Sequence, residues 1–225
     1  MNQKKTKIIT LAALSLGLGS LAQAGFVTIN SAPNPAAGEK NVVNNNEFKP
    51  DLAALGVLKY ATGVSLGVDE LGSVTYFYYG KEAGYDNVFK TSDLFYQTEF
   101  TPTLQNYFSK PIEIGSDDVG PGALDFRFCS LSGPSTLVGC VTNQQNDSLG
   151  WNASQSIAFS VSSSGNTAWL FWDDSGAGPD DNHDDMLIKA VFTPKAVPEP
   201  ATLSLFGLGL LGIWAGSRRR AARKI

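Results

Sequence analysis

Hydrophobic residues along this chain gather in short runs that are rich in Val, Ile, Thr, Phe, Tyr and Trp, and Gly, Pro, Asn and Ser separate these runs. Runs of this length and composition predict β-strands. The expected strands cover residues 26–29, 74–80, 94–100, 124–130, 135–141, 156–164, 167–172 and 186–192. Strands and helices do not alternate along the chain. The pattern therefore predicts an all-β fold, an antiparallel β-sandwich, with a larger jelly roll as the alternative.

The segment 74–80 shows the two-residue period of a strand. Its aromatic side chains alternate between the two faces, with Tyr76 and Tyr78 on one and Phe77 and Tyr79 on the other. Aromatic residues in such positions pack in a core, or they form a platform for sugar rings together with Trp169 and Trp172.

Two further segments carry weaker patterns. Apolar residues recur at helical spacing only in residues 51–61, where we expect the one helix of the domain. Residues 30–49 are polar and rich in Pro, Gly and Asn, which predicts a long loop or an irregular edge.

The N-terminal end has the three parts of a secretory signal peptide. Lys4, Lys5 and Lys7 precede an apolar stretch, and a cleavage site of small residues ends at Ala24. We therefore expect removal of residues 1–24 and a mature chain that begins at Gly25.

The C-terminal end has a different pattern of three parts. An apolar stretch over residues 201–217 follows a proline-rich triplet and precedes a basic tail over residues 218–225. The apolar part, about 24 Å long as a helix, predicts one transmembrane helix that tilts or thins the bilayer, with the tail in the cytoplasm. The residues outside the apolar part that carry this pattern are Pro198, Glu199, Pro200, Arg218, Arg219 and Arg220.

These parts, in this order at the end of a secreted chain, resemble the PEP-CTERM sorting signal of Gram-negative bacteria that make extracellular polysaccharide. The resemblance implies that an exosortase, a membrane-embedded cysteine transpeptidase, removes the tail. We expect export through the inner membrane, a transient inner-membrane anchor, and delivery to the cell surface or the extracellular space. The signal then covers residues 198–225, a linker covers 193–197, and the ectodomain covers 25–192.

The mature protein is strongly acidic. Residues 25–197 hold nine Lys and Arg against twenty Asp and Glu, a net charge near −11, whereas the whole chain carries a formal −4. A polyanion does not attract nucleic acid by charge. The expected partners are therefore cations, the exosortase and extracellular polysaccharide, and no nucleic acid.

The chain has two cysteines, Cys129 and Cys140, on either side of the turn signal Gly133-Pro134. Two strands joined at this turn would bring the thiols together. Because exported proteins fold in an oxidising compartment, we expect a disulfide between them.

Six aspartates lie within the thirteen residues from Asp173 to Asp185, a stretch without Lys or Arg. Carboxylate oxygens are the donors that Ca²⁺ binds in sets of roughly six to eight. The EF-hand template does not fit, because Asp185 stands at its Gly position and Val191 at its Glu position. The ligands expected from this loop are Asp173, Asp174, Asp180, Asp181, Asn182, Asp184 and Asp185.

A second segment is needed to complete the site. Glu82 and Asn87 lie in an expected loop after the strand 74–80, and we hypothesise that this loop and the acidic loop bind Ca²⁺ together. Two alternatives stay open: a solvated acidic loop that keeps the protein soluble, and side chains that cap a buried turn. The two segments resemble a recurrent ectodomain type among PEP-CTERM proteins, and that resemblance implies no activity. Its residues are Gly80, Glu82, Ala83, Gly84, Asn87 and Phe89 and the segment 178–185.

The sequence offers little for catalysis. His183 is the single histidine, so a Ser-His-Asp or Cys-His arrangement would require it, and the chain has no G-x-S-x-G element. No spacing singles out two carboxylates for glycoside hydrolysis. We therefore expect a non-catalytic surface or extracellular-matrix protein. A carbohydrate-binding module is the alternative, and a hydrolase is a third and weaker one.

Overall fold

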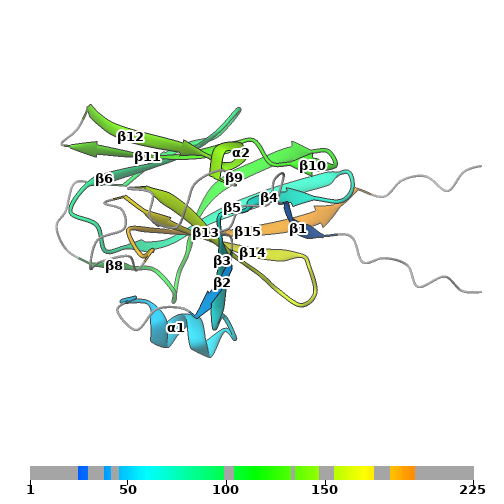
Figure 1. The fold of residues 1–225 in the computed structure, drawn as a ribbon, viewed down its shortest axis with the longest axis horizontal. Helices are drawn as coiled ribbons and strands as arrows, with labels where there is room; N and C mark the ends of the chain where they lie inside the picture. Colours follow the sequence, from blue (N-terminus) through cyan, green and yellow to red (C-terminus); the bar gives the residue numbers. More distant parts are fainter. Residues whose placement is uncertain are drawn as a thin grey trace, which may run out of the picture.

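The computed structural model describes residues 25–29, 38–41, 46–98, 104–132, 135–146, 155–174 and 183–195. Within these residues the chain forms strands and two short helices, and every strand pair is antiparallel (Figure 1). The predicted all-β, antiparallel architecture is confirmed at this level.

The largest sheet has eight strands in the order β2-β3-β13-β14-β15-β5-β8, with β9 also paired to β5. Its strands are β2 (Gly38–Asn41), β3 (Lys59–Thr62), β5 (Gly72–Lys81), β8 (Gln105–Asn106), β9 (Ile112–Val119), β13 (Ser156–Val161), β14 (Thr167–Asp173) and β15 (Met186–Pro194). The strongest expected strands, 74–80, 167–172 and 186–192, form its centre.

Two smaller sheets complete the β-structure. One has the order β1-β4-β10 and the other β12-β11-β6-β7. Their strands are β1 (Phe26–Ile29), β4 (Ser65–Val68), β6 (Asp86–Thr91), β7 (Phe95–Gln97), β10 (Gly122–Ala123), β11 (Phe126–Ser132) and β12 (Thr136–Thr142). The helices are α1 (Lys49–Ala54) and α2 (Asn143–Asn146).

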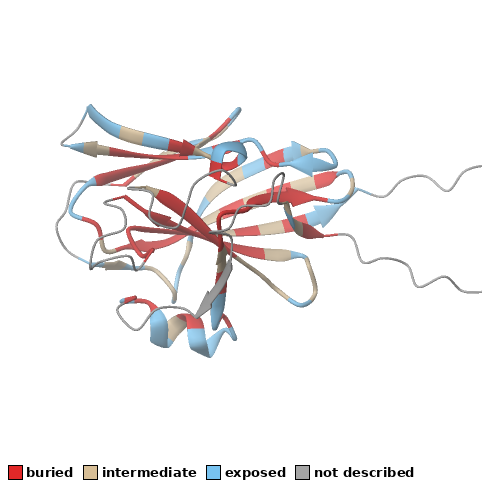
Figure 2. Cartoon of the chain, viewed as in Figure 1, coloured by how far each residue is buried: buried red, intermediate tan, exposed pale blue. Residues whose placement is uncertain are grey.

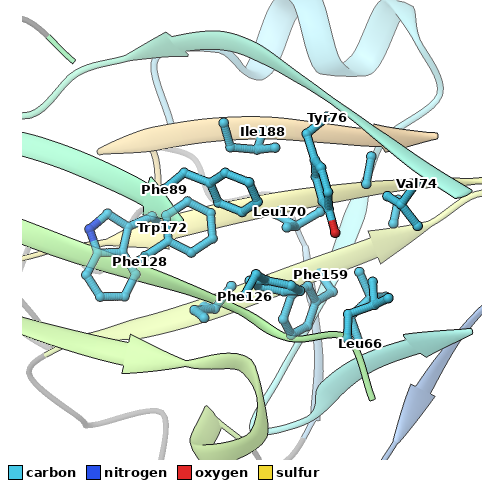
Figure 3. Close-up of a cluster of buried hydrophobic side chains, with 14 of the residues drawn as sticks. Leu66, Val74, Tyr76, Phe89, Phe126, Phe128, Phe159, Leu170, Trp172 and Ile188 are labelled. Atoms are coloured by element: carbon cyan, nitrogen blue, oxygen red, sulfur yellow. The ribbon is translucent and has the colours of Figure 1, made fainter. Parts of the chain in front are cut away.

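The main hydrophobic core lies between the large sheet and the two small ones. Residues from all three sheets meet in it, among them Leu66 of β4, Phe128 of β11 and Trp172 of β14 (Figure 3). The Trp172 ring stacks on Phe128 with centroids 5.4 Å apart. Two layers of strands that share one apolar core fit the predicted β-sandwich.

A second core covers the other face of the large sheet. Along β14, Ala168, Leu170 and Trp172 belong to the main core, while Trp169 and Phe171 belong to the second, where helix α1 packs. Buried residues therefore run without interruption along β14 from Ala168 to Asp173, whereas β5 and β15 alternate in part between buried and half-buried residues (Figure 2).

The aromatic residues of β5 follow the predicted alternation. The main core contains Tyr76 and Tyr78, while Tyr79 belongs to the second core and Phe77 packs against it. Tyr76, Tyr78 and Trp172 are fully buried, and Trp169 is 4 % exposed. These side chains pack in the cores, so they do not offer the flat exposed rings that a sugar platform needs.

The expected helix over residues 51–61 is shorter and begins earlier. Helix α1 ends at Ala54, because Gly56 takes a left-handed φ of 77° that other residues rarely adopt. The Gly56 and Val57 N–H groups donate to the Ala53 and Leu52 carbonyls (3.0 and 2.9 Å), which is the Schellman ending of a helix. The chain then turns back, and residues 59–62 form strand β3.

Other strands were not expected from the sequence. Strand β2 lies within the segment predicted as a loop, and the sequence did not indicate β4, β6 or β9. Asn87, expected in a loop after the strand 74–80, lies instead at the second position of strand β6, which corrects that prediction. Strand β15 continues to Pro194, two residues beyond the expected end of the ectodomain at residue 192.

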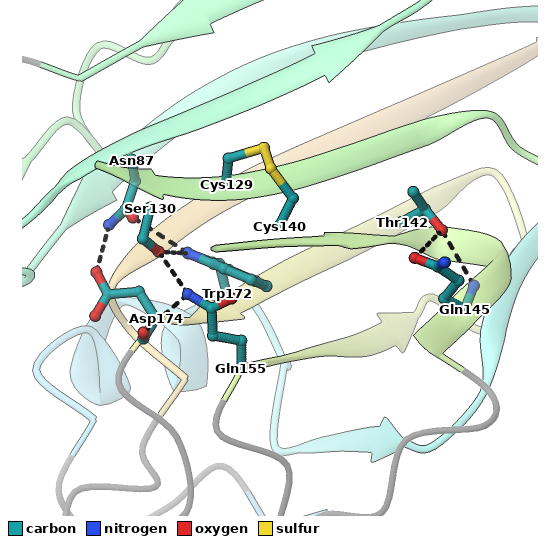
Figure 4. The surroundings of a disulfide bond; sticks show 9 residues. All are labelled: Asn87, Cys129, Ser130, Cys140, Thr142, Gln145, Gln155, Trp172 and Asp174. Carbon is teal, nitrogen blue, oxygen red and sulfur yellow. Dashed lines mark hydrogen bonds between the residues drawn. A yellow bond between two sulfur atoms is a disulfide. The ribbon is translucent and has the colours of Figure 1, made fainter. Parts of the chain in front are cut away.

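The predicted disulfide is present (Figure 4). Cys129 of β11 and Cys140 of β12 are directly opposite each other in the antiparallel register. The bond fastens β12, the edge strand of its sheet, to its only neighbour.

Helix α2 forms a polar plug between sheets. The Asn143 amide nitrogen donates to the Leu66 and Leu124 carbonyls (2.7 and 2.8 Å), and its oxygen accepts from the Leu66 N–H (2.8 Å). Asn146 bonds in the same way to Val64 and Ile157. Both side chains are fully buried, so α2 satisfies backbone groups that the sheets leave open.

The predicted signal peptide (1–24) and transmembrane segment (201–217) lie outside the described residues. Among the residues that the structure describes, no helix is long and apolar enough to cross a membrane.

Candidate metal centre

The two segments expected to form a metal site lie together. Strand β15 pairs with β14 on one side and with β5 on the other, which brings residues 173–174, 184–185 and 81–82 to one end of the large sheet. The backbone joins them: the Glu82 N–H donates to the Asp184 carbonyl (3.0 Å), and the Asp185 N–H donates to the Trp172 carbonyl (3.1 Å).

Three carboxylates form the tightest group. One oxygen from each of Glu82, Asp184 and Asp185 lies within 4.8 Å of the others. Asp184 is fully buried, Asp185 nearly so, and Glu82 is partly exposed. Hard oxygen donors at this spacing are suited to Ca²⁺, and the exposed side at Glu82 gives an ion a way in.

Asp174 and Asp185 form a hydrogen-bonded pair at the inner side of this group. The Asp174 N–H donates to Asp185 Oδ2 (2.7 Å). Burial raises the pKa of Asp185 to about 9, and the neighbouring charges of Asp174, Asp173 and Asp184 add to the effect. Burial also raises the pKa of Asp174, against the opposing hydrogen bonds from Asn87 and Asp185. A bound cation would favour the ionised form of both groups.

Asn87 has a different role from the one predicted. Its amide nitrogen donates to Asp174 Oδ2 (3.0 Å) and to the Asp185 carbonyl (2.9 Å), while its oxygen accepts from Trp172 Nε1 (3.2 Å; Figure 4). Because the indole N–H can only donate, this bond fixes the orientation of the amide. Asn87 therefore holds the carboxylates in place as a donor, and its oxygen points away from them.

A lysine that the sequence did not single out lies beside the carboxylates. Lys81 is fully buried at the end of β5, and its Nζ donates to the Tyr85 carbonyl (3.0 Å). Burial lowers the pKa of Lys81, although the charges of Asp86, Asp174 and Asp185 partly offset this. In the sequence, Lys81 is a single lysine that follows an aromatic strand. Sequence patterns do not distinguish such a buried lysine from one on the surface.

Asp86 adds a further carboxylate on the Lys81 side. It is 3 % exposed, and its Oδ1 has no hydrogen-bond partner. Buried polar atoms are nearly always satisfied, so an oxygen in this state indicates room for a cation or a water molecule.

Asp173 lies in a separate contact with His183. Asp173 Oδ2 is 3.9 Å from His183 Nδ1, and Ser156 Oγ is 2.8 Å from His183 Nε2. Ser156, His183 and Asp173 thus follow each other in the order of a nucleophilic triad. The three residues are at most 4 % exposed, and Ser156 lines none of the cavities found among the described residues, so a substrate has no access to its hydroxyl. His183 has a left-handed φ of 53° and packs on Tyr60, which suits a structural role in the turn before β15.

The remaining predicted site residues cannot be placed. Asp180, Asp181 and Asn182 lie outside the described residues, as do Ala24, Pro198, Glu199, Pro200, Arg218, Arg219 and Arg220. Of the expected ligands, the structure brings Glu82, Asp184 and Asp185 together, with Asp174 next to them.

Comparison with known proteins gives one match. The model of the PEP-CTERM protein-sorting motif matches residues 196–220, which contain the predicted Pro-Glu-Pro triplet, the apolar stretch and Arg218–Arg220. No curated protein and no solved structure matches the chain. The motif implies export and an exosortase that recognises the tail. The chain therefore carries, at its C-terminal end, the sorting signal of the PEP-CTERM proteins.

Proposed function

We propose that this chain is an exported, exosortase-sorted protein of the cell surface or extracellular matrix, whose β-sandwich is non-catalytic and is stabilised by Ca²⁺. The sorting motif at residues 196–220 supports the delivery, and a disulfide suits a protein that folds outside the cytoplasm. The single observation that carries the Ca²⁺ part is the close group of Glu82, Asp184 and Asp185 oxygens.

The site would act as a clamp. Asp184 and Asp185 precede β15, and Glu82 follows β5, so an ion held by all three would tie the ends of two paired central strands. Asp184 Oδ2 also accepts from the Glu47 N–H (2.8 Å), next to helix α1. Ca²⁺ would therefore stabilise the sheet and the packing of its outer face at once.

Thermal unfolding in Ca²⁺ and in EDTA tests this role. Extracellular Ca²⁺ sites bind with Kd of about 10⁻⁴ to 10⁻³ M, and an ion at 100 times Kd stabilises by about 2.7 kcal/mol. For a domain of this size that is a rise in Tm of roughly 5–10 °C. Glu82→Gln should remove most of the shift, and Glu113→Gln, an exposed carboxylate on β9, should leave it unchanged.

The alternative to a Ca²⁺ ion is that the Lys81 ammonium balances the charge of the carboxylates. If this ammonium alone balances the carboxylates, Ca²⁺ at about 10–100 mM, which is 100 times the expected Kd, will not change Tm, and the metal role is wrong. Mg²⁺ at the same concentration separates a selective site from general screening of charge, because Mg²⁺ demands a tighter octahedral geometry.

Delivery is tested separately by the mass of the exported protein. Cells with an active exosortase should yield a form that lacks the C-terminal tail, and cells without the enzyme should retain the tail. An intact tail in the presence of active exosortase would contradict the sorting proposal.

A carbohydrate-binding role remains the second candidate, at a cavity that includes only Trp169 of the aromatic residues expected to form a sugar platform. A cavity of about 480 Å³ opens on the outer face of the large sheet beside the end of helix α1. Its lining combines hydroxyl groups, an aromatic edge and a cation from Ser160, Ser162, Ser163, Thr167, Trp169 and Lys189. Retention on immobilised polysaccharide that Lys189→Ala abolishes would support this role.

A further inference from the structure

The first described residue, Gly25, is built into the fold. Its N–H donates to Asp69 Oδ1 (2.7 Å), and its carbonyl accepts from the Asp69 N–H (3.2 Å). The next N–H, from Phe26, donates to the Gly165 carbonyl (2.6 Å). Gly25 is buried at the start of β1, which pairs with β4 immediately before Asp69.

The position accepts only glycine. A Cβ on Gly25 would lie 2.4 Å from the Gly165 oxygen and 2.9 Å from its Cα, so the two backbones approach too closely for any side chain. Gly165 itself takes a left-handed φ of 73° in the turn between β13 and β14. The residue expected to become the N-terminus thus fits a tight backbone pocket beside a carboxylate.

We infer that signal-peptide removal creates an N-terminal ammonium group at Gly25 that pairs with the Asp69 carboxylate and locks β1 onto the sandwich. The inference rests on the proposed export. A signal peptidase hydrolyses the Ala24–Gly25 peptide bond with one water molecule. Ala24 takes the oxygen of the water molecule to form its new carboxylate, and the Gly25 nitrogen takes both water protons to become –NH₃⁺.

The carboxylate is already in place for this charge. Before cleavage, the single amide N–H of Gly25 donates to Asp69. After cleavage, the Gly25 ammonium group, a cation with three donors, occupies the same position. A charge on both partners makes a hydrogen bond shorter and roughly twice as strong as a neutral one. The other charged groups near this end are Glu70, next to Asp69, and Lys195, whose backbone N–H donates to the Leu71 carbonyl (2.9 Å).

The pair has a defined pH dependence. An α-amino group in an unfolded chain has a pKa of about 7.7–8.0, and a carboxylate partner raises this pKa in the folded protein. The added stability is therefore complete below that range and is lost as the pH rises through the higher folded value.

The test begins with the intact mass of the exported protein, which should place the N-terminus at Gly25. Thermal unfolding at pH 6 then compares this protein with a variant in which an extra Ala follows the cleavage site, so that the ammonium is displaced by one residue. The extension should lower Tm by about 2–4 °C. Asp69→Asn should remove the difference between the two chains, and Asp118→Asn, exposed on β9, should preserve it. At pH 10 the difference should shrink.

The outcomes separate this inference from the proposed export. A mature N-terminus at another residue would overturn both the cleavage site and the ion pair. An N-terminus at Gly25 with equal Tm values for the native and extended chains would overturn the ion pair and leave export intact. If the Tm difference between the native and extended chains persists in Asp69→Asn, its cause is the backbone pocket at Gly165, and the ion pair is contradicted.

Discussion

The polar plug of helix α2 gives the sharpest test of how the sheets are held together. Asn143→Ala removes three hydrogen bonds, two to the Leu66 backbone and one to the Leu124 carbonyl. The two carbonyls keep one donor each, because the Leu124 N–H reaches Leu66 O (3.0 Å) and Gln144 Nε2 reaches Leu124 O (2.9 Å). The buried Leu66 N–H loses its acceptor, Asn143 Oδ1, and is left without a partner.

The expected loss follows from this count. A buried N–H without a partner costs about 1–3 kcal/mol, and each of the other two bonds contributes about 0.5–1.5 kcal/mol. The sum is a fall of roughly 2–6 kcal/mol in the free energy of unfolding. Asn143→Asp keeps the shape but turns a donor toward two carbonyls into an acceptor, so its loss should be at least as large at pH 7.

Urea unfolding followed by tryptophan fluorescence measures the change, with unchanged m-values showing that the unfolded state is the same. Gln145→Ala is the matched control, because Gln145 is exposed on the same helix and its side-chain oxygen accepts from the Thr142 hydroxyl (3.0 Å; Figure 4). It should cost less than about 1 kcal/mol. If Asn143→Ala and Gln145→Ala differ by less than 1 kcal/mol, the plug does not stabilise the junction and this reasoning is wrong.

Two further predictions concern other parts of the domain. Replacing both Cys129 and Cys140 by Ser opens a link between residues 11 apart, so the free energy of unfolding should fall by about 3 kcal/mol. Reducing agent should reproduce the loss in the native protein and have no effect on the variant. Equal stability of the oxidised native protein and the double-Ser variant would contradict a stabilising role of the disulfide. Burial raises the pKa of Asp117, with Asp93 and Asp125 adding to the effect, so the folded state holds this proton to higher pH than the unfolded chain. Stability should therefore fall as the pH rises from about 4 through the raised pKa, and Asp117→Asn should flatten that slope. Asp118→Asn should keep it, and an identical pH profile for native protein and Asp117→Asn would refute the prediction.

The strands that sequence patterns predicted are those whose burial leaves a local signature. Strand β5 alternates visibly, β14 has an unbroken apolar run from Ala168 to Trp172, and β15 is apolar from Met186 to Phe192 except at Lys189. Strand β2 has the sequence Gly-Glu-Lys-Asn and exists because it pairs with β3, a tertiary fact with no local signal. The expected helix over residues 51–61 extends too far, because Gly56 ends the helix in a left-handed conformation that the apolar spacing does not register.

In the candidate site, too, some features have a local sequence signal and others depend on contacts between distant parts of the chain. Composition was enough to group Glu82 with Asp184 and Asp185, because acidic residues at the ends of strands tend to meet at one end of a sheet. The role of Asn87 depended on the direction of its amide, which Trp172 fixes from another strand. Lys81 and Asn143 were missed for a related reason: a buried polar residue differs from an exposed one only in its partners, and those come from distant parts of the chain.

The double burial of strand β14 has a consequence for how the sheet finds its pairing. In a strand with one wet face, a slip by one residue exposes the apolar side chains and is penalised at once. In β14 both faces are apolar, so a slipped strand would still bury hydrophobic surface, with only the sizes of the side chains mismatched. The directional contacts at its end, from Trp172 to Asn87 and from Asp174 to Asp185, are absent in any slipped pairing. The acidic end of the sheet thus specifies the alignment of the central strands.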